Sequence, residues 1–90
     1  MGRQKFNKMK AKKIDELVST ARFADKTYHK YKLIMLYDGS QIAEYDMSSG
    51  DRGSKADSKS PESWVRMNMT FLIQLNNRDE NKVELNVVVL

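Results

Sequence analysis

The apolar residues of this sequence change their spacing near Thr27, and this change constrains the fold more than any other feature. After Thr27, apolar and other residues alternate, which is typical of strands. Before it, apolar residues recur at helical spacing and share one stripe of a helical wheel: Ile14, Leu17, Val18, Ala21 and Ala24. The sequence therefore predicts an N-terminal amphipathic helix followed by β-structure.

A first β-hairpin is expected from residues 27–37 and 41–47, around a turn marked by Asp38 and Gly39. A three-residue loop places Lys32 opposite Asp46 and keeps one face apolar. A two-residue loop would mix polar and apolar groups on both faces. We therefore expect the three-residue loop.

A second hairpin is expected from residues 67–76 and 83–89, joined by a loop at 78–80. Before it, Ser60 and Pro61 predict a short helical turn, with Ser as N-cap and Pro at the first helical position. The expected apolar face of the first of these strands comprises Met67, Met69, Phe71, Ile73 and Leu75. The predicted fold class is α+β, with the N-terminal amphipathic helix packed on a four-stranded antiparallel sheet made of two β-hairpins.

The chain of 90 residues is long enough for one domain. We expect a basic arm over residues 1–13 and a single α+β domain over 14–90. A Ser/Gly-rich loop at 48–63 is expected to be flexible, because it lacks apolar residues larger than Ala. Long loops of this kind are either functional or disordered, and the composition favours disorder.

The positive charge is concentrated at the start of the chain. Residues 1–32 carry ten Lys+Arg and three Asp+Glu, a net charge of +7, whereas the remainder has a net charge of −3. Clustered Lys and Arg bind nucleic acid by releasing counterions, although a solvated terminus is the plainer interpretation. The predicted nucleic-acid contacts are Arg3, Lys5, Lys8, Lys10, Lys12 and Lys13, with Tyr28, Lys30 and Lys32 as secondary contacts.

Several apolar residues are expected on the sheet face that the helix does not cover. By strand parity they are Ile34, Leu36, Ile42, Leu72, Val88 and Leu90. We interpret them as an interface for a protein partner or a second copy of the chain, with partial exposure at strand ends as the alternative.

The sequence offers no pattern for catalysis. His29 is the only histidine and is expected at the rim of the sheet, and there is no cysteine. No nucleophile motif, metal-ligand spacing, cofactor motif or membrane span is found in the sequence. We expect a cytoplasmic, non-enzymatic binding protein without cofactor or metal, contacting nucleic acid through the basic arm. The alternative is a protein–protein interaction module, such as a regulator, inhibitor or oligomeric assembly subunit.

Overall fold

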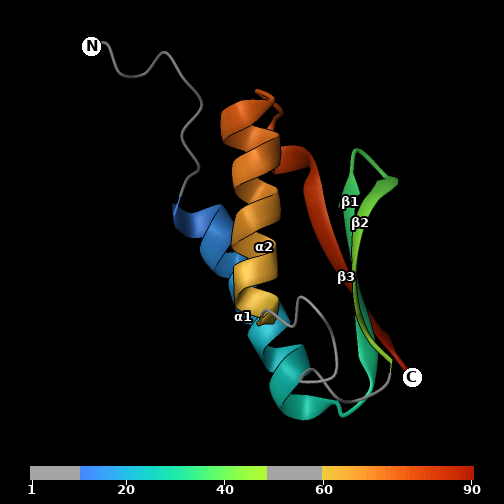
Figure 1. Ribbon diagram of the computed structural model, residues 1–90. Coiled ribbons are helices and arrows are strands. Elements are labelled where there is room, and N and C mark those ends of the chain that lie inside the picture. Colours follow the sequence, from blue (N-terminus) through green and yellow to red (C-terminus); the bar gives the residue numbers. More distant parts are fainter. Residues whose placement is uncertain (1–10, 49–59) are drawn as a thin grey trace.

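The computed structural model describes residues 11–48 and 60–90, with side chains from Lys13 onward. Both long helices lie on one face of an antiparallel sheet with strand order β2-β1-β3, so the fold is α+β (Figure 1). The elements in chain order are α1 (Ala11–Thr27), β1 (Tyr31–Tyr37), β2 (Ser40–Met47), α2 (Pro61–Met69), the π-helix η3 (Thr70–Leu75), the 3-10 helix η4 (Glu80–Lys82) and β3 (Val83–Val89).

Helix α1 has the amphipathic character that the sequence predicts. All five residues of its expected stripe are buried, and Ala21 and Ala24 are completely inaccessible to solvent. Small side chains at these two positions allow the helix backbone to lie close to its neighbours. The hydroxyl of Tyr31 donates a hydrogen bond to Asp25 Oδ1 at 2.7 Å, which ties the end of α1 to the start of β1.

In the β1–β2 hairpin, the pairs that involve Tyr31, Leu33 and Met35 are those predicted, but the turn that joins the two strands is different. Met35 pairs with Ala43 as expected, yet the turn is a two-residue loop in which Asp38 and Gly39 have φ angles of 53° and 86°. Positive φ at both central positions is typical of the tight turn that matches strand twist. A β-bulge beside Ile42 then restores the register, so the expected three-residue loop is wrong.

The segment expected as the third strand is a helix. Helix α2 begins at Pro61, with the Ser60 hydroxyl accepting a 3.1 Å hydrogen bond from the Ser63 N–H, and continues without a break into η3. The expected helical turn is therefore confirmed at its start but extends to Leu75. Among the described residues the sheet has three strands, and the second hairpin with its 78–80 loop is wrong.

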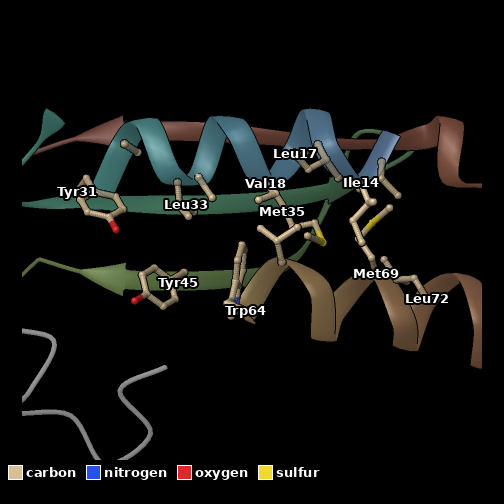
Figure 2. Close-up of a cluster of buried hydrophobic side chains, with 14 of the residues drawn as sticks. Ile14, Leu17, Val18, Tyr31, Leu33, Met35, Tyr45, Trp64, Met69 and Leu72 are labelled. Carbon is tan, nitrogen blue, oxygen red and sulfur yellow. The ribbon is translucent and has the colours of Figure 1, made fainter. Parts of the chain in front are cut away.

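Strand β3 pairs with β1 instead, from Tyr37 opposite Val83 to Tyr31 opposite Val89. This makes β1 the central strand and explains why Tyr31, Leu33 and Met35 are wholly buried. Figure 2 shows these side chains between the sheet and the two helices, together with Trp64 from α2.

Candidate protein-interaction surface

Two of the predicted nucleic-acid contacts that the structure describes form ion pairs with glutamates. Lys30 is exposed, but Lys32 Nζ lies 3.3 Å from Glu44 Oε2 and Lys13 Nζ lies 3.9 Å from Glu16 Oε1. The Tyr28 ring is half-buried, edge-on to Phe23 at 6.3 Å. Outside the described part of the chain lie Arg3, Lys5, Lys8 and Lys10, and the side chain of Lys12 is not described.

The excess positive charge lies outside the described residues. Residues 11–48 and 60–90 carry nine Lys+Arg and ten Asp+Glu, a net charge of −1. Residues 1–10 contribute +4 and residues 49–59 contribute +1, which together give the net charge of +4. The described residues taken together are therefore close to electrically neutral.

The sheet face away from the helices holds only part of the predicted interface. Ile34 and Leu36 lie there half-buried, and Val88 is 41% exposed. Leu90 is exposed, and its N–H extends the ladder by donating to the Lys30 carbonyl at 3.1 Å. An interface made of these residues stays a prediction.

Two residues assigned to that face lie elsewhere. Leu72 belongs to η3, not to a strand, and is buried among the core residues. Ile42 sits at the β-bulge and borders a hollow that is otherwise lined by residues of α2, η3 and the segment after them. The bulge changes the alternation that strand parity assumes, so parity misplaced Ile42.

The most exposed group of large apolar side chains on a helix is on α2 and η3. Met67, Phe71 and Leu75 are 54%, 59% and 69% exposed and recur at every fourth residue. That spacing places them on one side of the helix, and we call them the apolar stripe. They line a groove of about 510 Å³ together with Arg66, Asn68 and Thr70.

A second hollow lies on the other flank of the stripe. It has a volume of about 300 Å³ and shares Phe71 with the groove. The Arg78 guanidinium at its rim sits 5.2 Å from the centre of the Tyr37 ring, and the Arg78 N–H donates to the Leu72 carbonyl at 3.0 Å. The residues that line this hollow are Ile42, Asn68, Phe71, Leu72, Asn76 and Arg78.

The segment that follows η3 is held by hydrogen bonds in which backbone groups take part. The Asn76 side-chain amide donates to the Phe71 carbonyl at 2.8 Å, and the Asn76 N–H donates to the same oxygen at 3.1 Å. The Asp79 N–H donates to the Tyr37 hydroxyl at 3.0 Å, which anchors the chain after η3 to the sheet. These hydrogen bonds tie the segment that follows the stripe to η3 and to the sheet.

Glu62 fixes the orientation of α2 relative to α1. Its Oε1 accepts from Arg22 Nη2 at 2.6 Å and from Arg22 Nε at 3.0 Å, and its Oε2 accepts from Arg66 Nε at 3.0 Å. These hydrogen bonds from Arg22 and then Arg66 lower the pKa of the Glu62 carboxyl below its usual value of 4.5. The flank of the stripe that carries Arg66 consequently faces α1.

The sequence interpretation missed the stripe because it placed these three residues on the core face of a strand. The signal was present in their spacing of four, which fits a helix as well as alternation fits a strand.

The described part of the chain holds neither a candidate metal site nor a candidate membrane span. Within 11–48 and 60–90, His, Asp and Glu side chains form no group of three that could hold a metal ion. None of the helices in the same ranges is long and apolar enough to span a bilayer.

Comparison with protein-family models, curated proteins and solved structures gives no match to this chain.

Proposed function

We propose that this protein is a small non-enzymatic protein-interaction module and that the apolar stripe is its binding surface. The observation that carries the proposal is the exposure of Met67, Phe71 and Leu75 on one side of a helix whose opposite side is buried. A sequence that only needed to cover its core would be expected to carry polar residues at these positions.

The size of the exposed apolar surface supports this assignment. Taking about 180 Å² for a large side chain, the stripe and neighbouring Ile42 offer roughly 400 Å² of apolar surface. The largest apolar patch on a monomeric protein is typically about 300–600 Å² and is often functional. Anchors at every fourth residue suit the helix-to-groove mode of recognition.

Site-specific photo-cross-linking in cells tests the proposal. A photoreactive amino acid at Leu75 should capture a protein, identified by mass spectrometry, whereas the same group at exposed Ser19 on α1 should not. Phe71→Asp in the Leu75-labelled chain should reduce the capture, because it places a charge at the centre of the contact. Equal capture at positions 75 and 19 would contradict the proposal.

Binding to nucleic acid is a second candidate, favoured by the distribution of charge. The net charge of −1 on the described residues leaves the excess positive charge of the chain to residues 1–10 and 49–59. A basic segment attached to a near-neutral remainder of the chain is suited to non-specific phosphate binding.

Fluorescence anisotropy with random DNA and RNA at several salt concentrations tests this second candidate. The full chain should bind with a steep logarithmic salt dependence, and a chain that begins at Ile14 should lose up to about five units of that slope. Absence of binding by the full chain at low salt would exclude it.

A further inference from the structure

We propose that the apolar stripe binds a second copy of this chain, with the two α2 helices antiparallel across a two-fold axis near Phe71. The inference rests on the proposed function, because it uses the same surface and names its partner. A two-fold interface uses one patch twice, so the patch must complement itself in area, charge and shape.

The area suits a reversible dimer. A standard protein interface buries about 800 Å² per partner, of which a little over half is apolar. The stripe with Ile42 supplies roughly 400 Å² of apolar surface per copy. This nearly equals the apolar part of a standard interface and is far below that of obligate dimers. Because this area is far below that of obligate dimers, the dimer is expected to dissociate reversibly on dilution.

The charges near the stripe do not oppose this pairing. Arg66 lines only the groove, on the flank nearest α1, and Arg78 lines only the hollow on the other flank. Antiparallel, face-to-face pairing reverses the direction of the helix but keeps each flank on its own side. Each arginine therefore shares a flank with its own counterpart in the second copy. The two Arg66 side chains lie five residues on either side of the axis, about 15 Å apart along the helix, and each donates to Glu62 of its own copy. Each Arg78 guanidinium lies over the Tyr37 ring of its own copy. With a net charge of −1 on the described residues, long-range repulsion between these residues of the two copies is small.

The surface is also complementary in shape to the same surface of the second copy. The same two-fold axis brings the two 300 Å³ hollows to face each other, and Phe71 borders each of them. The two Phe71 rings can then fill the shared space against Leu72 and Ile42. Near the ends of the contact, Met67 of each copy lies opposite Leu75 of the other, so that apolar side chains meet along the whole stripe.

Sedimentation velocity of the purified full chain tests the dimer directly. The wild type should show a reversible monomer–dimer equilibrium between about 1 and 500 μM, and Phe71→Asp should weaken it at least about tenfold. Phe23→Asp is the matched control, because Phe23 is an aromatic residue of equal exposure, 58% against 59%, on the other helix. A wild type that stays monomeric over this range, or a dimer insensitive to Phe71→Asp, would overturn the inference.

The orientation can be tested by disulfide trapping, since the chain has no cysteine of its own. A mixture of Met67→Cys and Leu75→Cys chains should form a mixed disulfide dimer in higher yield than either variant forms alone. A parallel arrangement would give the opposite order of yields and would contradict the two-fold axis proposed here. Both residues are exposed, so these substitutions leave the core intact.

Failure of the dimer and failure of the proposed function give different results. A monomeric protein whose Leu75 cross-links to another protein in cells overturns only the second copy as partner. A protein that neither self-associates nor cross-links through the stripe overturns both proposals.

Discussion

Truncation of two adjacent residues, Leu72 and Phe71, distinguishes a helix from a strand over residues 67–75. In the helix, Leu72 is 8% exposed and part of the core, whereas Phe71 is 59% exposed. In the alternating strand that the sequence favours, Phe71 would be in the core and Leu72 would point away from it. The two arrangements therefore predict opposite orders of destabilisation.

The expected losses in the free energy of unfolding follow from how much of each side chain is buried. Leu72→Ala removes three buried carbon atoms and leaves a cavity, which should cost about 3 kcal/mol. Phe71→Ala loses only the 41% of its surface that is covered. Because a fully buried Phe→Ala costs about 3–5 kcal/mol, and because Ala favours helix, this change should cost about 1 kcal/mol.

Urea denaturation followed by circular dichroism measures both costs. With an m-value of about 1–3 kcal/mol/M, Leu72→Ala should lower the midpoint by roughly 1–3 M and Phe71→Ala by about a third of that. The measurement belongs at a protein concentration of about 1 μM, so that self-association does not contribute to the stability. A larger loss for Phe71→Ala than for Leu72→Ala would refute the helical geometry and, with it, the stripe.

Three further changes test other parts of the structure. Because Arg22 and Arg66 lower the Glu62 pKa, the ion pair stabilises the fold above the unfolded value of 4.5, and this stabilisation is lost as pH falls through the lowered pKa. The stability difference between wild type and Glu62→Gln, from urea titrations, should therefore be constant at neutral pH and shrink as pH falls below 4.5. Gly39→Ala should cost about 1 kcal/mol, because φ is +86° although no atom lies within 4 Å of the added Cβ; an unchanged thermal midpoint would argue against this turn. Ser60→Ala removes the N-cap of α2 and should cost about 1 kcal/mol in the same assay, whereas Ser60→Asp should retain most of the stability.

The sequence predicts an element correctly where the spacing of its apolar residues fits either a helix or a strand, but not both. Over α1, the buried residues from Ile14 to Ala24 match a helix and do not alternate, so the prediction is confirmed. Over β1, the burial of Tyr31, Leu33 and Met35 follows strict alternation, and that prediction is confirmed too. In both cases the apolar pattern excludes the competing structure.

Residues 67–75 fit both spacings, and this is why they were assigned to a strand. The odd-numbered apolar residues alternate, but Val65, Met69, Leu72 and Ile73 also form a helical stripe, and these are the residues that the core buries. Local chemistry decides for the helix, because Ser60 and Pro61 initiate it and no turn signal ends it before Asn76. A helix-start signal followed by a segment without Gly or Pro outweighs alternation.

The β-bulge at Ile42 could not be predicted in the same way. The sequence sets two demands, an Asp-Gly dipeptide that favours a two-residue turn and an apolar face that requires a different register. One extra residue in β2 satisfies both demands, at the cost of one disrupted ladder position. Ile42 thereby comes to border the hollow beside Phe71, where strand parity would have placed it on the opposite face.

The reassignment of one segment from strand to helix also moves the candidate binding surface. If residues 67–75 formed a strand, Met67, Phe71 and Leu75 would be buried in the core. The outer sheet face would then be the apolar surface that remains available to a partner. As a helix, the same segment supplies Met69 and Ile73 to the core and leaves the other three to solvent. On the outer sheet face, Ile34 and Leu36 are half-buried, and the exposed residues Val88 and Leu90 lie at the end of β3, at 41% and 57% exposure. The exposed apolar surface that association would remove from water is thus greatest on α2 and η3, and the interaction is expected there.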